Sequence, residues 1–256
     1  MTVVAGPPGI GKTTWIRQFL KPTTDAPLFY LCPAAGTEAV DRLRIGYSFP
    51  HVSVLEEAEV PALLMNLPNK AQIYMELGFH VDLMTLPLNG LPCRRVAIVP
   101  PNLPSSEWHH WANEIVIGNK VDIAQAPNLP ALWRAPLTGQ VFDPPSLDEL
   151  LIELTGGAYG QVIRLKGIFE LPDGQALYID FVKGLSGIEY TDLKLPRWLE
   201  GRPNRLSGLE VIGYDLQQTT IAKTLLVTCL SDSILAQYQQ QYQQHYDTSD
   251  TEETMA

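Results

Sequence analysis

The chain has 256 residues, 45% of them hydrophobic, so it can bury the core of one large domain or of two smaller ones. Its formal net charge of −10 argues against nucleic acid or an anionic membrane as the principal partner. Three widely spaced cysteines favour a reducing compartment, and with neither a signal peptide nor a bilayer-spanning apolar run in the sequence we expect a cytoplasmic protein.

The first expected strand, Thr2–Ala5, leads through a glycine loop into a helix expected at Trp15–Leu20. The loop has the pattern GxxxxGK[ST], in which glycines let the backbone turn its N–H groups around an anion. This context predicts a phosphate-binding loop, with Lys12 reaching the outer phosphates and the Thr13 hydroxyl coordinating Mg²⁺. The alternative is an ordinary strand-to-helix turn. The nucleotide-binding residues expected here are Gly6, Gly9, Ile10, Gly11, Lys12, Thr13 and Thr14.

Four further apolar runs are short and mostly continuous, as expected of strands covered by helices on both faces. They lie at Leu28–Leu31, Gln72–Leu77, Val96–Val99 and Ile115–Ile117. Between them, Val54–Leu67 and Ser105–Asn113 are expected to be helical, the second with a cap at its start. The predicted fold class is therefore α/β, a mostly parallel P-loop NTPase sheet with helices on both faces, in a nucleotide-binding domain over residues 1–155.

A second nucleotide signal follows the strand at Ile115–Ile117. There the chain reads Gly118-Asn119-Lys120-Val121-Asp122, which contains the pattern NKxD. At a strand end this pattern is used to recognise guanine, because the Asp carboxylate accepts hydrogen bonds from the ring N1–H and the exocyclic amine, which adenine lacks. The alternative is a surface turn in which Asp122 caps a helix. Together with the upstream glycine loop, Asn119, Lys120 and Asp122 indicate a guanine site.

Beyond Gly156-Gly157 the sequence predicts a small α+β domain over residues 158–232. Strands are expected at Gln161–Phe169, Gln175–Val182 and Leu209–Tyr214, with a turn at Leu171–Gly174 and a helix over Gln217–Leu230. Arg164 and Lys166 share one face of the first strand, where pairing with Asp180 or Glu170 is favoured over a binding role. Residues 237–256 are rich in Gln and Tyr and then acidic, so we expect a disordered tail.

These residues resemble the CobW-like GTPases of the SIMIBI class, whose members are proposed to deliver metal ions to target proteins. Three stretches carry the resemblance: the glycine loop, the segment Ala112–Asp122, and the second domain. In that domain, the strand Val162–Gly167, the segment Gly201–Leu206 and the strand Val211–Leu216 are similar to the family. The resemblance implies a two-domain GTP-binding protein that uses Mg²⁺, acts on a protein client and commonly dimerises.

The resemblance alone suggests a functional role for two carboxylates between the nucleotide motifs. Glu76 is similar to a family strand-end Glu near the γ-phosphate, where it would position water or hold Mg²⁺ through water. Asp41 is similar to a switch-region Asp near Mg²⁺. The alternatives are a carboxylate that caps a turn at Gly78 and a solvated Asp at a helix start. The interval from Asp41 to Glu76 is shorter than the family usually has.

The family's Cys-x-Cys-Cys motif has no counterpart here, since Cys32 is the only cysteine between the glycine loop and Glu76. The soft ligands that favour Zn²⁺ or Co²⁺ are therefore missing from that interval. His109 and His110 are adjacent on an expected helix and point about 100° apart, which disfavours a shared ion.

The predicted function is slow, Mg²⁺-dependent GTP hydrolysis, with Lys12 and Glu76 as catalytic residues and with metal delivery or cofactor assembly as the implied role. One alternative is a nucleotide-binding regulator or scaffold with little turnover. Another is an ATP-using kinase or ATPase in which NKxD arose by chance. The client, any transition metal and the number of subunits stay open.

Overall fold

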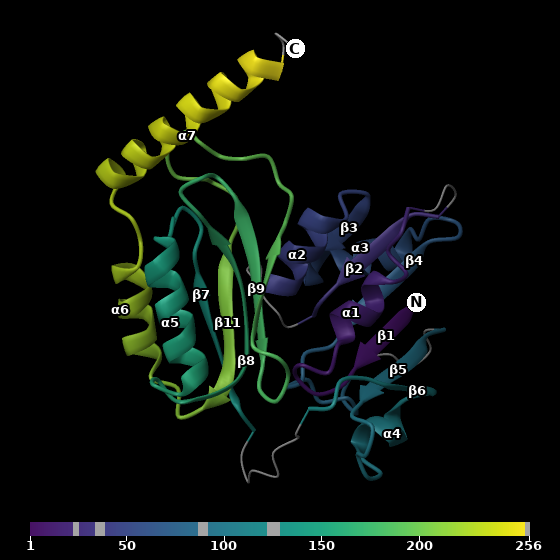
Figure 1. The fold of residues 1–256 in the computed structure, drawn as a ribbon. Helices are drawn as coiled ribbons and strands as arrows, with labels where there is room; N and C mark the ends of the chain where they lie inside the picture. Colours follow the sequence, from purple (N-terminus) through teal and green to yellow (C-terminus); the bar gives the residue numbers. More distant parts are fainter. Residues whose placement is uncertain (23–25, 34–38, 87–91, 122–128, 254–256) are drawn as a thin grey trace. The chain divides into compact units, whose positions relative to one another are not determined.

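The computed structural model of the protein describes residues 1–22, 26–33, 39–86, 92–121 and 129–253, with side chains up to Gln244. The chain divides into two compact units, Met1–Leu129 with Val182–Ser186, and Pro130–Phe181 with Gly187–Ala256. Each unit is built around its own β-sheet (Figure 1). None of the described helices is both long enough and apolar enough to cross a membrane.

The first unit contains a six-stranded sheet in which every strand pair is parallel. Its strands are β1 (Thr2–Ala5), β2 (Leu28–Leu31), β3 (Val52–Leu55), β4 (Gln72–Glu76), β5 (Arg94–Val99) and β6 (Glu114–Ile117), in the spatial order β3-β2-β4-β1-β5-β6. The helical segments are α1 (Lys12–Arg17), α2 (Val40–Ser48), the 3₁₀ turn η1 (Glu57–Glu59), α3 (Val60–Met65) and α4 (Glu107–Trp111).

Helices cover both faces of this sheet. Ile16 of α1 and Ile45 of α2 pack with Val4 of β1 on one face. On the other face, α3 and Trp111 of α4 pack with Val3, the residue of β1 directly before Val4. Since neighbouring residues of a strand point to opposite faces, both faces of β1 are buried, which explains its continuous apolar sequence. The predicted α/β class is confirmed.

The five strands expected in this unit all form, with ends that agree within two residues. The helix expected over Val54–Leu67 is wrong in its first part. Val52–Leu55 is strand β3, which pairs in parallel register with β2, and helical structure begins only at Glu57. The β-branched Val52 and Val54 favour this edge strand. The expected cap of the later helix is Ser106, whose backbone N–H donates to Nδ1 of His109 at 3.2 Å.

The second unit contains a five-stranded sheet with the order β10-β9-β8-β11-β7. Its elements are β7 (Ala131–Pro136), α5 (Pro144–Gly156), β8 (Gln161–Glu170), β9 (Ala176–Val182), β10 (Ile188–Asp192), β11 (Gly208–Tyr214), α6 (Gln218–Val227) and α7 (Asp232–Glu253). The pairs β10–β9, β11–β8 and β11–β7 are antiparallel. Together with α5 and α6, this sheet forms the α+β domain that the sequence predicts.

The predicted boundary between the two domains is wrong. It was expected at residue 155, whereas the structure divides the chain after Leu129. The reason is that Leu147, Leu150 and Leu154 of α5 are buried with Leu165 and Val211 of the second sheet. The second unit therefore begins with β7, before the start expected at residue 158.

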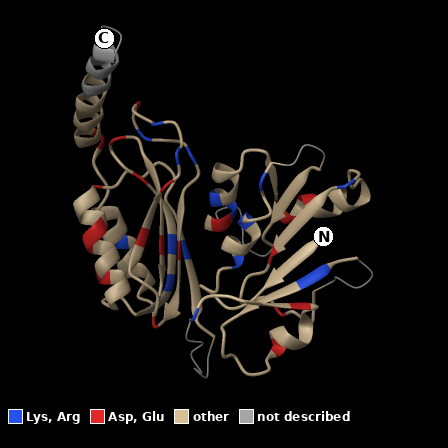
Figure 2. Cartoon of the chain, turned by 45° about the vertical axis from the view of Figure 1, so that its right-hand side comes forward, with Lys and Arg blue, Asp and Glu red and all other residues tan. Residues whose placement is uncertain are grey.

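The strands of the second sheet carry charged residues of both signs (Figure 2). Glu210 of β11 lies between Leu209 and Val211, which belong to the core below α5, so its side chain points to the opposite face. Nζ of Lys166 lies 3.1 Å and Nε of Arg134 lies 3.3 Å from its carboxylate. Arg164 pairs with Asp180, as expected, whereas Lys166 pairs with Glu210 instead of Glu170.

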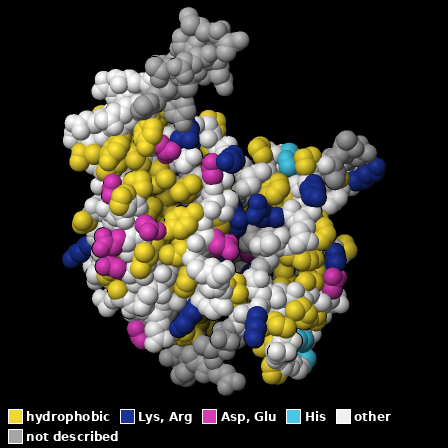
Figure 3. Space-filling view, viewed as in Figure 1, with side chains coloured by type: hydrophobic (Ala, Val, Ile, Leu, Met, Phe, Trp, Pro, Cys, Tyr) yellow, Lys and Arg dark blue, Asp and Glu magenta, His cyan; other side chains and the backbone are white. Residues whose placement is uncertain are grey.

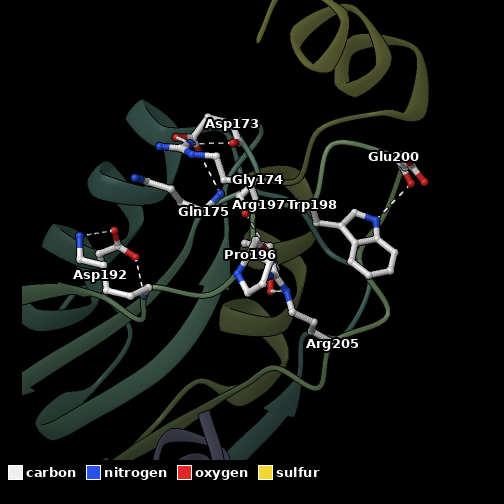
Figure 4. Close-up of polar contacts among 12 residues, drawn as sticks. Asp173, Gly174, Gln175, Asp192, Pro196, Arg197, Trp198, Glu200 and Arg205 are labelled. Atoms are coloured by element: carbon white, nitrogen blue, oxygen red, sulfur yellow. Dashed lines mark hydrogen bonds and ion pairs between the residues drawn. The ribbon is translucent and has the colours of Figure 1, made fainter. Parts of the chain in front are cut away.

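The loop between β10 and β11 is held by arginines (Figure 4). Arg197 donates to the backbone oxygen of Asp173 at 2.8 Å, in the predicted turn after β8. Arg205 binds the carboxylate of Glu170 through two nitrogens, at 3.0 and 2.5 Å. Glu170 is only 1% exposed, so Arg205 neutralises a buried charge. The family-like segment Gly201–Leu206 thus has a structural role in this unit.

The prediction of a disordered tail over residues 237–256 is also wrong, because α7 continues to Glu253. Leu235 is buried with Val141 and Leu230. One turn later, the side-chain amide of Gln239 accepts from the N–H of Gly201 at 2.8 Å and donates to its oxygen at 2.9 Å.

Other apolar side chains of the unit stay exposed among charged ones, for example Ile152, Leu226 and Val227 (Figure 3).

Candidate nucleotide site

The glycine loop runs from the end of β1 to the start of α1. Its glycines all have positive φ, +144° at Gly6, +75° at Gly9 and +100° at Gly11. A Cβ atom at Gly6 would lie 2.2 Å from the carbonyl oxygen of Ile98 in β5, so that position excludes every other residue type. The local structure is the strand–loop–helix arrangement that the sequence predicts.

Lys12 is the first residue of α1 and is 8% exposed. Its ammonium group donates to the backbone oxygens of Gly6 at 2.9 Å and Pro7 at 3.1 Å. The positive charge therefore lies at the concave side of the loop, where phosphate oxygens bind in loops of this pattern.

Glu76 lies beside the loop because β4 is the direct neighbour of β1, with Glu76 opposite Val4 in the register. Its Oε1 accepts a hydrogen bond from the Thr13 hydroxyl at 2.9 Å, and its Oε2 accepts one from the Tyr30 hydroxyl, also at 2.9 Å. The carboxylate is 4% exposed. Glu76 is thus directed towards the first turn of α1.

Tyr30, in β2, was not singled out from the sequence. Its side chain is fully buried, and this burial, together with the negative charge of Glu76, raises the pKa of Tyr30 well above its usual value. The hydroxyl therefore stays protonated and remains a donor. A tyrosine in an otherwise apolar strand was a usable signal, because a buried hydroxyl usually finds a partner.

Asp41 lies in the first turn of α2 and is 7% exposed, so it is not a solvated residue at a helix start. Burial and the charge of Glu76 are the main causes of the raised pKa of Tyr30, and the Asp41 carboxylate contributes to it in the same direction. Thr13, Glu76 and Asp41 offer oxygen ligands. Oxygen donors of this kind fit a hard cation such as Mg²⁺.

The residues after β6 lie against the glycine loop. The backbone N–H of Asn119 donates to the oxygen of Ile10 at 3.1 Å, and its side-chain amide donates to the oxygen of Gly9 at 2.9 Å. Gly118 makes this approach possible, because a Cβ atom there would lie 2.4 Å from the oxygen of Ile10. A glycine directly before Asn119 was the sequence signal for this contact.

The structure describes two of the three other residues of the NKxD pattern. Lys120 is exposed and Val121 is buried. Asp122, the residue expected to read guanine, lies outside the described residues. The structure thus brings Asn119 to the loop and leaves the position of Asp122 as an expectation.

Two of the described histidines make hydrogen bonds at other places in the first unit. Nε2 of His51 lies 2.7 Å from the oxygen of Leu20, and His109 bonds to Ser106 in the cap of α4. Within the described ranges, no group of three or more His, Cys, Asp or Glu residues could hold a metal ion. None of the described cysteines, Cys32, Cys93 and Cys229, forms a disulfide.

The fold and the site together define a P-loop α/β domain followed by a small α+β domain. Residues 138–229, most of the second unit, match the family described as the cobalamin synthesis protein cobW C-terminal domain. That part of the chain is therefore similar to a CobW C-terminal domain, in agreement with the resemblance seen in its sequence. No curated protein matches the chain.

Two solved structures are similar to the chain. The Zn(II)-bound YjiA GTPase from E. coli has 12% identity and a TM-score of 0.33, over 89% of this chain and 98% of that one. A Zn(II)-bound triple mutant of YjiA has 12% identity and a TM-score of 0.32 over the same shares. At these values we base the assignment on the family match and on the geometry of the site.

Proposed function

We propose that the protein binds GTP with Mg²⁺ at the glycine loop and hydrolyses it slowly. The observation that carries this proposal is the contact of Asn119 with the loop at Gly9 and Ile10. It joins the two sequence motifs, one for phosphate and one for guanine, in a single unit of the fold. Nucleotide recognition requires that the two motifs share one ligand.

In the proposed mechanism, the N–H groups of the glycine loop bind the phosphates. The ammonium group of Lys12 leaves the oxygens of Gly6 and Pro7 and neutralises charge on the γ-phosphate. The Thr13 hydroxyl and the Asp41 carboxylate would hold Mg²⁺, which supplies charge neutralisation at the β- and γ-phosphates when bound. Glu76 positions the attacking water, and Asp122 accepts hydrogen bonds from guanine.

Nucleotide competition tests the identity of the ligand. We expect GTP to displace a fluorescent guanine nucleotide and ATP to fail, while Lys12→Ala should abolish binding. Asp122→Asn should shift the preference from GTP to xanthosine triphosphate, because the amide donates where the carboxylate accepted. Unchanged guanine affinity in this variant, measured by calorimetry, would rule out the assignment of the base.

Steady-state phosphate release tests turnover. Release above background with GTP and Mg²⁺ supports a GTPase, whereas binding without release supports the alternative of a nucleotide-binding regulator or scaffold. Delivery of a transition metal to a protein client, in the cytoplasm, is a separate proposal that the family resemblance implies. It predicts that Zn²⁺ or Co²⁺ changes the rate of GTP hydrolysis, and equal rates with and without these ions would oppose it.

A further inference from the structure

The hydroxyl of Tyr30 reaches the side of Glu76 that Thr13 does not use. Tyr30 lies in β2 and Glu76 at the end of β4, and these neighbouring strands pair in parallel register. The hydroxyl donates to Oε2 at 2.9 Å, while Thr13 donates to Oε1 at the same distance. The two carboxylate oxygens are thus each bound by a hydroxyl from a different element, β2 and α1.

Two donors on opposite oxygens restrict the carboxylate more than one donor does. The terminal torsion of a glutamate side chain has a broad energy minimum, so a single hydrogen bond leaves the carboxylate plane free to swing. A second bond, from a ring that is itself 0% exposed, fixes this plane. The orientation of Glu76 therefore depends on the Tyr30 hydroxyl.

We propose that Tyr30 is a positioning residue whose hydroxyl holds the Glu76 carboxylate in the orientation required by Thr13 and by the attacking water. This inference rests on the proposed function for its effect on turnover. Tyr30 does not touch the nucleotide in this scheme and acts through Glu76. Because burial and the charge of Glu76 raise the pKa of Tyr30, its hydroxyl stays protonated and can donate.

The competing explanation is that Tyr30 only fills the core. Its ring lies among Val4, Ile16 and Ile45, where a phenylalanine ring would pack equally well. The substitution Tyr30→Phe therefore separates the hydroxyl from the ring. Tyr74→Phe is a matched control, because Tyr74 belongs to the same core cluster, but its hydroxyl donates to Oε1 of Gln72 at 3.1 Å and not to Glu76.

The first test compares the kinetics of both variants with GTP. A misoriented carboxylate slows the chemical step and leaves substrate binding intact, so Tyr30→Phe should lower kcat about tenfold with KM unchanged within about twofold. Tyr74→Phe should keep both values. Equal kcat in the two variants would overturn the proposal, as would a change in KM alone.

The second test does not depend on turnover. Thr13 donates to Glu76, so the methyl resonance of Thr13 in the nucleotide-free protein reports on the carboxylate. We expect Tyr30→Phe to shift or broaden this ¹³C-methyl signal, assigned through its loss in Thr13→Ser, while Tyr74→Phe leaves it in place. An unmoved signal in Tyr30→Phe would contradict the proposal. If the wild-type protein released no phosphate, the GTPase proposal would fail, and the methyl comparison would still decide the role of Tyr30.

Discussion

Asn119 donates a hydrogen bond from its side-chain amide to the backbone oxygen of Gly9 at 2.9 Å, across 110 positions of sequence. The bond fixes the end of β6 against the glycine loop between β1 and α1.

Asn119→Ala should weaken GTP binding about three- to tenfold, because one hydrogen bond of about 1 kcal/mol no longer holds the loop. The measurement is the dissociation constant of a fluorescent guanine nucleotide. Asn113→Ala is the control, since Oδ1 of Asn113 accepts from Arg95 at 3.2 Å at the start of β6, away from the loop. A loss of affinity as large in the control would show that β6 as a whole, and not its contact with the loop, matters.

Gly118→Ala should destabilise the protein by about 1–3 kcal/mol, because the added methyl group must displace backbone. It would lie 2.4 Å from the oxygen of Ile10. Urea unfolding measures the loss, and nucleotide affinity should fall with it as the segment moves off the loop. Gly156→Ala is the contrasting change, since a Cβ atom there meets nothing within 4 Å. Equal stability of the two variants would mean that the close approach at Gly118 is absent in solution.

Arg205→Ala should cost about 3–5 kcal/mol at pH 8, because Glu170 would be left as an unpaired buried charge. In the wild type, burial raises the pKa of Glu170 and Arg205 lowers it in part. Without the arginine the pKa rises further, so the folded variant takes up a proton as the pH falls, and its deficit should shrink towards pH 5.

Urea unfolding at both pH values measures this dependence. The control is Arg197→Ala, whose partner Asp173 lies near the surface, and it should cost under about 1 kcal/mol with little change between pH 5 and pH 8. A deficit of Arg205→Ala that is the same at both pH values would indicate that the carboxyl group of Glu170 does not titrate in this range.

Gln239→Ala should loosen the first turns of α7. The side chain is 5% exposed and bonds to both backbone groups of Gly201. We expect amide hydrogen exchange in these turns to become about tenfold faster, which corresponds to the loss of about 1.4 kcal/mol. Gln240→Ala, one exposed position further on, should leave exchange as it is. Slow exchange retained in Gln239→Ala would mean that Leu235 alone holds the helix.

The strands of the first unit could be predicted because each is a short apolar run between breakers, a local property of the sequence. Strand β3 was missed although Val52 and Val54 alternate with other residues, because the acidic residues that follow directly favour a helix. The domain boundary was missed for a different reason. The leucines of α5 predict a buried helix face, but their spacing does not say which of two sheets they cover.

Residue type and local order were sufficient to select the glycine loop and Asn119 as candidates, and their roles stay predictions. Neither Tyr30 nor, in the second unit, Gln239 could be selected in this way, because their contacts depend on partners that only the folded chain brings near. Tyr30 meets Glu76 across 46 positions, through the adjacency of β2 and β4, and Gln239 meets Gly201 across 38. Strand order and helix docking are tertiary facts that composition and periodicity do not contain.

The hydrogen bond between Tyr30 and Glu76 also couples the substitutions that these two positions can accept during evolution. If position 30 lacks a hydroxyl, the carboxylate at position 76 loses a hydrogen-bond donor. If position 76 lacks a carboxylate, the hydroxyl at position 30 becomes a buried donor without an acceptor. Among related sequences we therefore expect the two positions to change together, with tyrosine at the first accompanying glutamate at the second.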